Sequence, residues 1–543
     1  MAASSKPADE SSHSYNALPN DQGFDSMISD TKFTADTRTD FYDRSLTSRR
    51  YALVGMACSS IFSCSCIVAG IVTLATHGVP GVTVTKLSVH NDNNQLPLQG
   101  EILALALNFI VMLCTESIGL VHSISLRSAL ASESRLRFNT NLRLLTAARG
   151  WHNLMAPCLM VSRLSSSLYP TARPHSSYAS TTEPTPQWLA PPDNFIAFAG
   201  LPLIVLGVAL LLQVVIALSG MRAVKILTWS SSPFDLTAAL VHHTQLTPAT
   251  LRCMRCVSDL DTNGGPVKPP EIQPSAWHAH PSIRKVVIFL WVIVAACAGW
   301  ATLMMYIWHN SPGDDSMSPY ALTAHTWSFI PDLKHGKVNY VTYTMPGINL
   351  EAWILMFGNM AIVQGPLTLG LHCSELIANV IRDERQWRCA TSRKGLSTAT
   401  NPVTTIFTHP ICLILFVAKP FLHWMFGLSL QIYTDAAYGK LGIFCYDILT
   451  LVQIWNLCIA LFIFACLFTF VTLRRPRGPQ PAAYGHLQTL ANLVDEWSPV
   501  MWWGHKEDGI PYCHAGTSDH PLPDVKMDCV YAGSGAGSLV PLS

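Results

Sequence analysis

Several long runs in this chain carry no charged side chain, and they limit what it can fold into. Hydrophobic residues make up 49% of the sequence and charged residues only 13%, against roughly 25% charged in soluble domains. The runs reach the length of about 20 residues that crosses the hydrocarbon of a bilayer. Because unpaired backbone groups are costly there, each run must form a helix. The sequence therefore predicts an all-α integral membrane protein.

Hydropathy predicts seven transmembrane helices directly. They cover residues 51–76, 102–126, 195–218, 286–308, 353–381, 411–433 and 441–473. An eighth segment, 151–169, is weaker because it contains Arg163 and three consecutive serines. Its counterpart in the second half, 411–433, also carries a cation, Lys419, and is clearly apolar. Eight spans are therefore predicted.

The spans belong to a four-helix unit that occurs twice in tandem. Residues 486–495 (HLQTLANLVD) stand 253 positions after residues 233–242 (PFDLTAALVH), and GLHCS at 370–374 echoes GLVHS at 119–123. Because each unit has an even number of spans, both copies keep the same orientation, as in parallel repeats. The predicted fold is an all-α membrane protein with eight transmembrane helices as two parallel four-helix repeats, each followed by a cytosolic amphipathic helix.

The predicted domains follow from this repeat. They are a disordered cytosolic N-tail over 1–50, the first repeat with its amphipathic helix over 51–243, a cytosolic linker over 244–285, the second repeat with its amphipathic helix over 286–497, and a cytosolic C-tail over 498–543. The N-tail is polar without an early apolar core, so it is not a signal peptide. The amphipathic helices are expected to lie on the inner leaflet or to pack against their own bundle. Trp502 and Trp503 are expected to anchor the tail at the membrane interface.

Lysine and arginine place both termini in the cytosol. With eight spans, the five cytosolic segments hold 28 of the 35 Lys and Arg residues, and the four outer loops hold 5, which is the positive-inside pattern. The plasma membrane and an internal membrane both fit. The lipid bilayer is the predicted partner, and the Arg-rich loop 382–388 has either a topogenic role or contact with anionic lipid. A net charge of +1 gives no footprint for nucleic acid.

Five ionisable residues lie within predicted spans and are the candidate site residues. They are Glu116, Arg163, Glu375, Lys419 and Asp447. Pairing Glu116 with Arg163 and Glu375 with Lys419 would neutralise both repeats in the same way. Such residues form either a polar pathway for an ion or small solute, or hydrogen-bonded contacts that hold helices together. Glu375 is near the cytosolic end of its span, where a side chain can extend to the interface.

No catalytic, cofactor or metal site is predicted. Cys253 and Cys256 form a lone CxxC, and Cys513, His514 and His520 follow in the tail, but zinc sites usually show two matched pairs at fixed spacing. The chain also contains no G-x-S-x-G, Walker or HExxH motif. No catalytic residues are therefore assigned.

Motifs in the tail resemble those of a large family of fungal multipass membrane proteins of unknown function. They include YGHLQTL at 484–490, WGHK at 503–506 and HAGT at 514–517. The resemblance implies the architecture and a fungal source, and no catalytic residues. Three functions are open: a transporter-like or channel-like protein, a membrane scaffold or adaptor acting through its cytosolic loops and tails, and an intramembrane enzyme. Convergence of the charged residues on a wet cavity favours the first, and a dry bundle with paired carboxylates favours the second.

Overall fold

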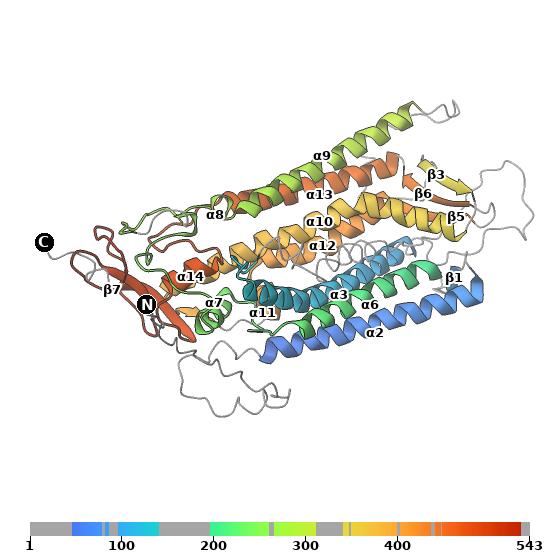
Figure 1. The fold of residues 1–543 in the computed structure, drawn as a ribbon. Helices are drawn as coiled ribbons and strands as arrows, with labels where there is room; N and C mark the ends of the chain where they lie inside the picture. The colour runs from blue at the N-terminus through green and yellow to red at the C-terminus, as the bar shows by residue number, and fades with distance from the viewer. Residues whose placement is uncertain are drawn as a thin grey trace, which may run out of the picture. The chain divides into compact units, whose positions relative to one another are not determined.

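The computed structural model describes residues 46–78, 82–85, 96–140, 196–259, 265–310, 340–346, 349–398, 402–435, 440–446 and 448–533. These residues are mostly helical, and seven of the helices are long and apolar enough to cross a membrane (Figure 1). The seven are α2 Leu46–His77, α3 Leu96–Ser132, α6 Gly200–Ala223, α9 Pro281–His309, α10 Leu350–Arg388, α12 Pro410–Ser429 and α13 Ile448–Leu473. They correspond to the seven runs found by hydropathy. The weaker segment 151–169 lies outside the described residues.

Helices α2, α3 and α6 pack together, and α2 and α6 approach most closely (Figure 1). A Cβ added at Gly207 of α6 would lie 2.8 Å from the backbone oxygen of Ser63, and one added at Gly70 of α2 would lie 2.8 Å from that of Gly200. The Ser63 hydroxyl donates to the Gly207 carbonyl oxygen at 2.5 Å. Small residues of this kind let helix backbones meet where lipid gives no hydrophobic drive for association.

Gly207→Ala is expected to lower the free energy of unfolding by about 1–3 kcal/mol, the usual cost of overpacking. The new methyl group would meet Ile67 Cγ1 at 2.6 Å as well as Ser63. Gly299→Ala in α9 is the matched control, because, apart from its chain neighbours and the nearby backbone of its own helix, no heavy atom of the described residues lies within 4 Å of its added Cβ. The control is expected to be as stable as the unchanged protein or slightly more stable. Unfolding in detergent checks both variants, and equal stability would contradict the close α2–α6 contact.

Helices α9, α10, α12 and α13 form a second group, and α12 also contacts α3 of the first group. Their shared core includes Met356, Ile377, Leu457 and Phe468, all of them buried. The contact between α12 and α3 brings together helices from the two halves of the sequence.

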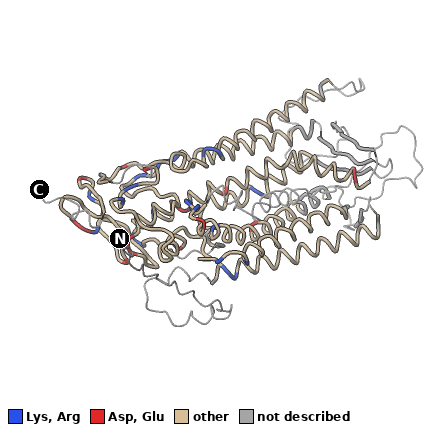
Figure 2. The backbone as a smooth tube through the Cα atoms, viewed as in Figure 1, with Lys and Arg blue, Asp and Glu red and all other residues tan. Residues whose placement is uncertain are grey.

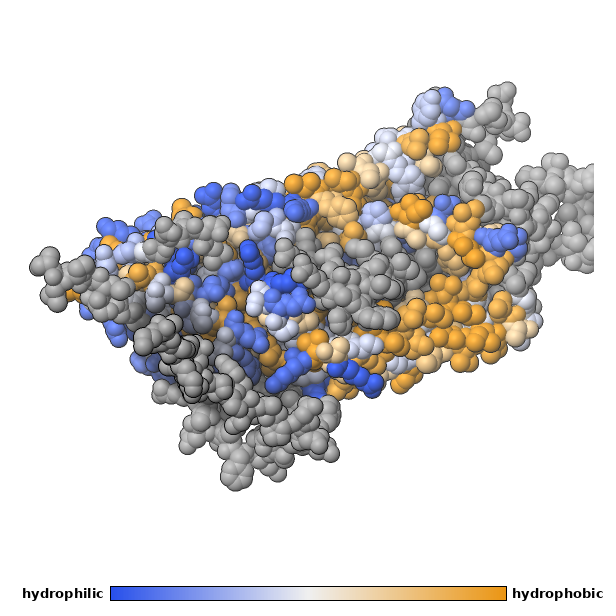
Figure 3. Space-filling model, in the orientation of Figure 1, coloured by the Kyte–Doolittle hydropathy of each residue, from blue (hydrophilic) through white to orange (hydrophobic). Residues whose placement is uncertain are grey.

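The outer surface of the helices is apolar, which fits a lipid environment. Ile61, Ile362 and Phe470 are 68%, 75% and 68% exposed. Figure 3 shows hydrophobic surface along the helices and hydrophilic surface at one end. Charged residues are sparse along the helices and gather at the same end in Figure 2. An apolar surface of this extent needs a lipid or protein cover.

Short antiparallel strands cap the other end of the helices (Figure 1). Strands β1 Val82–Thr85 and β2 Ile196–Ala199 pair, and β3 Tyr340–Pro346, β6 Lys440–Tyr446 and β5 Gln431–Asp435 form a sheet in the order β3-β6-β5. Three predicted spans are therefore wrong at one end. Helix α13 begins at Ile448 and not at 441, α6 begins at Gly200 after β2, and α12 ends at Ser429 before β5. Helices and strands both accept apolar residues. These residues form strand β6 because β3 and β5 supply hydrogen-bond partners for its backbone.

The linker, the end of α10 and the C-tail fold together at the polar end of the helices. We call the described residues of 226–280, 383–398 and 476–533 the linker–tail domain. Its elements are α7 Pro233–His242, η4 Val257–Asp259, α8 Ala276–Ala279, η6 Cys389–Thr391, β4 Leu396–Ser397, α14 Leu487–Leu493, β7 Val500–Glu507 and β8 His514–Ser518. Outside this domain, the short helix α11 Pro402–Thr408 lies between β4 and α12. Strands β4, β7 and β8 form an antiparallel sheet. Phe234, Met254, Trp387, Trp503 and Tyr531 share the domain core.

Helices α7 and α14, which hold the repeated motifs, pack against each other. Leu236 and Leu240 of α7 contact Leu487 of α14 in one buried cluster. Every residue of α7 from 233 to 240 is buried, so this helix packs within the protein. Trp503 is 3% exposed, with its ring 6.2 Å from that of Trp387. The interfacial-anchor prediction is therefore wrong for Trp503, because β7 turns its side chain into the domain core.

Candidate functional site

Three helices bring four ionisable side chains together within the apolar part of the bundle. Glu116 comes from α3, His372 and Glu375 from α10, and Lys419 from α12. We call these four residues the Lys419 cluster. Helix α12 contacts both α3 and α10. Lys419 is near the middle of the 20 residues of α12, so the cluster lies well inside a membrane-spanning segment.

Lys419 lies between two carboxylates. Its Nζ donates hydrogen bonds to Oε1 of Glu116 and to Oε1 of Glu375. Nδ1 of His372 lies 2.7 Å from the same Glu375 oxygen, one helical turn away on the same face of α10. The Lys419 side chain is 6% exposed, whereas the side chains of Glu116 and Glu375 are 35% and 31% exposed. The cluster is therefore a continuous chain of polar contacts across three helices, with a buried cation at its centre.

The donor atoms of the cluster also converge. One ligand atom each from Glu116, His372 and Glu375 lie within 4.8 Å of one another. Carboxylates and histidine both exchange protons, and histidine does so near neutral pH. The arrangement can therefore transfer a proton between neighbouring groups, or exchange the lysine ammonium for another small cation.

A second polar contact continues along the same two helices. Nε2 of Gln364 in α10 lies 3.1 Å from Nδ1 of His423, which follows Lys419 by one turn of α12. Gln364 is 4% exposed, and within the described residues no donor reaches its Oε1 atom. A buried polar atom without a partner costs about 1–3 kcal/mol, unless water or a solute meets it. The polar seam therefore leads from the Lys419 cluster toward the strand-capped end of the bundle.

The structure confirms one of the two predicted pairs and changes the other. The Glu375 carboxylate pairs with Lys419 as predicted, rather than extending away to the interface. The sequence predicts Arg163 as the partner of Glu116, and in the structure Glu116 shares Lys419 with Glu375. Arg163 and Asp447 lie outside the described residues. The contact between Glu116 and Lys419 connects the first half of the chain to the second.

Sequence reasoning missed the neutral and titratable neighbours of these charges. Gln364, Thr368, His372 and Glu375 follow one another at intervals of four, four and three residues, which places them on one face of a helix. His423 follows Lys419 by four residues in the same way. This helical spacing of polar residues in an apolar segment is the signal that identifies the seam.

A second buried network closes the polar end of the bundle. Nη1 of Arg127 in α3 donates to Oδ1 of Asn139 at 2.7 Å, and Nδ2 of Asn139 donates to Oδ2 of Asp383 in α10 at 2.9 Å. Arg127, Asn139 and Asp383 are 6%, 2% and 1% exposed. The Arg-rich segment 382–388, predicted as a loop, is the last part of helix α10, and its Arg382 pairs with the other Asp383 oxygen at 2.9 Å. This network attaches α3 to α10 and has a structural role.

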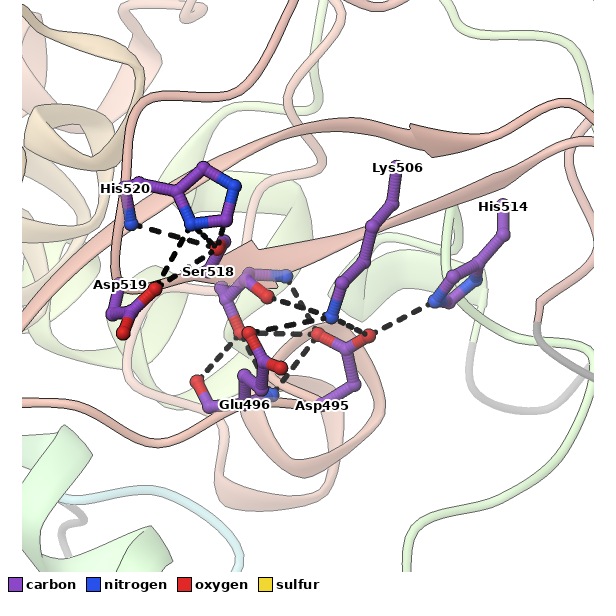
Figure 4. Close-up of polar contacts among 8 residues, drawn as sticks. Asp495, Glu496, Lys506, His514, Ser518, Asp519 and His520 are labelled. Atoms are coloured by element: carbon purple, nitrogen blue, oxygen red, sulfur yellow. Dashed lines mark hydrogen bonds and ion pairs between the residues drawn. The ribbon is translucent and has the colours of Figure 1, made fainter. Parts of the chain in front are cut away.

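Asp495 attaches the end of α14 to the β7–β8 hairpin (Figure 4). Lys506 Nζ at 3.0 Å and His514 Nε2 at 2.9 Å contact its Oδ2 atom, and the Thr517 backbone N–H donates to Oδ1 at 2.6 Å. Although burial opposes charge here, these contacts hold the pKa of Asp495 well below its usual range. Burial likewise opposes charge on His514, but Asp495 and the Cys253 thiol raise the pKa of His514 to about 9. The cluster is an internally paired structural contact.

The two thiols of the CxxC sequence lie in different environments. Cys256 Sγ is 3.1 Å from Oδ2 of Asp259, and Cys253 lies beside His514. His520 pairs with Asp519 at 2.9 Å. Over the described ranges, neither thiol belongs to a group of three His, Cys, Asp or Glu side chains with converging ligand atoms.

Asp235 is an acid buried in the first turn of α7. It is 4% exposed, and burial raises its pKa to about 7, although a hydrogen bond with Ser230 favours the carboxylate. The folded pKa is above the unfolded value, so the folded state binds the proton more tightly. The stability associated with the protonated acid is complete below about pH 4 and is lost as the pH rises through about 7.

Asp235→Asn is expected to remove the loss of stability that ionisation of Asp235 causes, since the amide keeps the shape of the side chain without its charge. The variant should gain stability relative to the unchanged protein between about pH 5 and pH 8, with each pKa unit worth about 1.4 kcal/mol. Unfolding midpoints measured across this range check the result. A stability difference that does not change with pH would contradict the elevated pKa.

Seven apolar helices make the chain a polytopic membrane protein. No protein-family model matches it, and comparisons with curated proteins and with solved structures found no similar protein. A functional conclusion therefore depends on the chemistry of the chain's own residues.

Proposed function

We propose that the protein is transporter-like and carries a proton or another small cation past the Lys419 cluster. The proposal depends on the position of Lys419 between Glu116 and Glu375 inside apolar helices. A charge within a span costs at least about 2.5–3.5 kcal/mol on insertion scales, and such groups commonly mark ion pathways and proton relays. Four titratable groups from three helices in direct contact are what a relay requires.

In this mechanism Lys419 competes with the transported cation. A cation or proton that reaches the carboxylates displaces the ammonium from Glu116 or from Glu375. The 2.7 Å contact between His372 and Glu375 gives a proton a direct path between those two side chains. Because Glu116 and Glu375 lie on different helices, releasing one of them changes the contact between α3 and α12 or between α10 and α12. Occupancy is thereby coupled to helix movement.

The architecture that we propose for this function has eight spans in two parallel four-helix repeats, with both termini cytosolic. The packing of α7 against α14 and the distribution of Lys and Arg support it. It also fits the fungal multipass family that the tail motifs resemble. Single cysteines at Ser5→Cys and Ser543→Cys, in a background without other reactive thiols, should be labelled from the same side. Labelling from opposite sides would exclude eight spans.

Flux through purified protein in liposomes tests transport. Glu116→Gln and Glu375→Gln each remove one charge and keep the side-chain shape, so they are expected to abolish flux measured with pH-sensitive or cation-sensitive dyes. Glu351→Gln is the matched control, because Glu351 is exposed in the first turn of the same helix as Glu375. The control should transport like the unchanged protein. Absence of any proton or cation flux in the unchanged protein, or full flux in both cluster variants, would refute the proposal.

The pairing of both carboxylates with Lys419 also fits a second candidate function, a membrane scaffold or adaptor. The linker–tail domain supports this function too. Its core joins segments from the linker, the end of α10 and the C-tail into one folded surface. A scaffold needs no flux, and substitutions in the Lys419 cluster would then alter stability alone. The liposome experiment therefore separates the two functions.

A further inference from the structure

We propose that His505, Asp508, Cys513 and Cys529 bind a zinc ion in the linker–tail domain. His505 is on β7, Asp508 directly follows that strand, Cys513 directly precedes β8, and Cys529 lies in a later turn. One imidazole, two thiolates and one carboxylate form a ligand set that suits tetrahedral zinc and does not suit magnesium or calcium. The site is separate from the Lys419 cluster and does not depend on the proposed transport.

Three of the four ligands already converge. One ligand atom each from His505, Asp508 and Cys513 lie within 4.8 Å of one another. Nε2 of His505 is 3.1 Å from Oδ1 of Asp508, and Sγ of Cys513 is 3.8 Å from the same oxygen. Zinc bonds of about 2.0–2.3 Å in a tetrahedron hold ligand atoms roughly 3–4 Å apart. Small side-chain adjustments therefore suffice to enclose the ion.

Cys529 supplies the second thiolate. Its thiol lies close enough to the Cys513 thiol for the two to interact. Backbone pairing fixes this approach, since the Cys513 N–H donates to the Val530 carbonyl oxygen at 2.9 Å and the Ala532 N–H donates to the Cys513 carbonyl oxygen at 3.1 Å. A thiol is a weak hydrogen-bond donor and acceptor, so this contact alone stabilises the turn little. Shared coordination of one ion would give the approach of Cys529 to Cys513, beside His505 and Asp508, a purpose.

The surroundings of His505 orient its ring for coordination. A bulge interrupts the pairing of β7 with β8 between His505 and Glu507, and bulges redirect side chains. The Tyr531 hydroxyl lies 2.8 Å from Nδ1 of His505, which leaves Nε2 directed at the site. Zinc-binding histidines commonly have such a partner on the other ring nitrogen. His505 and Cys513 are 7% and 8% exposed, while the exposed Asp508 gives the ion an entry path.

Lys526 competes with the ion for Asp508. Its Nζ lies 2.7 Å and 2.8 Å from the two carboxylate oxygens. The two side chains are 45% and 66% exposed, and an ion pair this open to solvent contributes little stability. A divalent ion held by two thiolates can therefore displace the lysine.

Cobalt binding to the reduced full-length protein in detergent tests the site. After treatment with a chelator, one equivalent of Co²⁺ is expected to produce thiolate-to-cobalt absorption and tetrahedral bands, which zinc should remove. Cys513→Ser and Cys529→Ser should lose the thiolate absorption. Asp508→Asn changes a side chain that is 66% exposed, and it should weaken cobalt binding at least tenfold. Cys389→Ser, at an exposed thiol in η6, is the matched control and should bind cobalt normally.

Three results would overturn the assignment. The first is an unchanged protein that takes up no stoichiometric cobalt or zinc. The second is unaltered binding in both Cys513→Ser and Asp508→Asn. The third is a Cys513–Cys529 disulfide found by mass spectrometry, with no metal binding after reduction. If the site is correct, zinc raises the unfolding temperature of the unchanged protein more than that of Cys529→Ser.

Discussion

Replacing Lys419 by methionine is expected to lower the free energy of unfolding by about 3–5 kcal/mol. The variant leaves Glu116 and Glu375 side by side without the cation that they share. Removing one partner of a buried ion pair is strongly destabilising, because the remaining charge has lost its compensation. Methionine has a length similar to that of lysine, so the loss is electrostatic rather than the result of a cavity. Unfolding in mild detergent, followed by circular dichroism, measures it.

The triple variant Lys419→Met/Glu116→Gln/Glu375→Gln is the control for this result. It removes all three charges and is expected to recover most of the lost stability, because neutral replacement of a whole buried ion cluster is often tolerated. Losses that simply add across the three positions would show that the side chains do not interact. The proposed relay would then lose its physical basis.

Trp387→Ala is expected to destabilise the linker–tail domain by about 3–5 kcal/mol. The side chain is fully buried. Its ring contacts Phe234 and Trp503 at centroid distances of 6.1 Å and 6.2 Å, and Nε1 donates to the Pro481 carbonyl oxygen at 2.7 Å. Alanine leaves a cavity where the linker, α10 and the tail meet. Limited proteolysis within residues 244–285 should become faster, together with a lower unfolding midpoint.

Trp387→Phe separates packing from hydrogen bonding. Phenylalanine keeps an aromatic ring in the core and loses the donor to Pro481, so its cost should be about 1–3 kcal/mol and smaller than that of alanine. If the alanine variant unfolds and is cleaved like the unchanged protein, the three segments do not share the core that Trp387 occupies.

The seven apolar helices could be predicted closely because their cause is local. An apolar run in a membrane has to satisfy its own backbone hydrogen bonds, whatever its neighbours are. The span predicted over 411–433 is helix α12, Pro410–Ser429. The strand β6 could not be predicted in this way. Its residues are as apolar as the first turns of a membrane-spanning helix. They form a strand because they pair with β3 and β5.

The charged residues of the candidate site were also visible in the sequence, and so was the pairing of Glu375 with Lys419, but the partner of Glu116 was not. Glu116, Glu375 and Lys419 stand out because ionisable groups are rare in apolar segments. The choice of Lys419 as the partner of Glu116 depends on the contact between α3 and α12, whose residues are 303 positions apart. His505, Asp508 and Cys513 carry no paired motif, and only the folded β7–β8 hairpin brings them together.

The sequence by itself determined that this chain is helical and membrane-embedded. It also identified the polar residues whose free-energy cost inside a membrane implies a specific role. These properties follow from the transfer of side chains and backbone groups into hydrocarbon, which each segment obeys separately. The tertiary structure decided which charges meet, that the linker and tail fold into one domain, and where thiols and imidazole converge. Those outcomes depend on contacts between distant segments, and no local pattern of residues specifies the partner of such a contact.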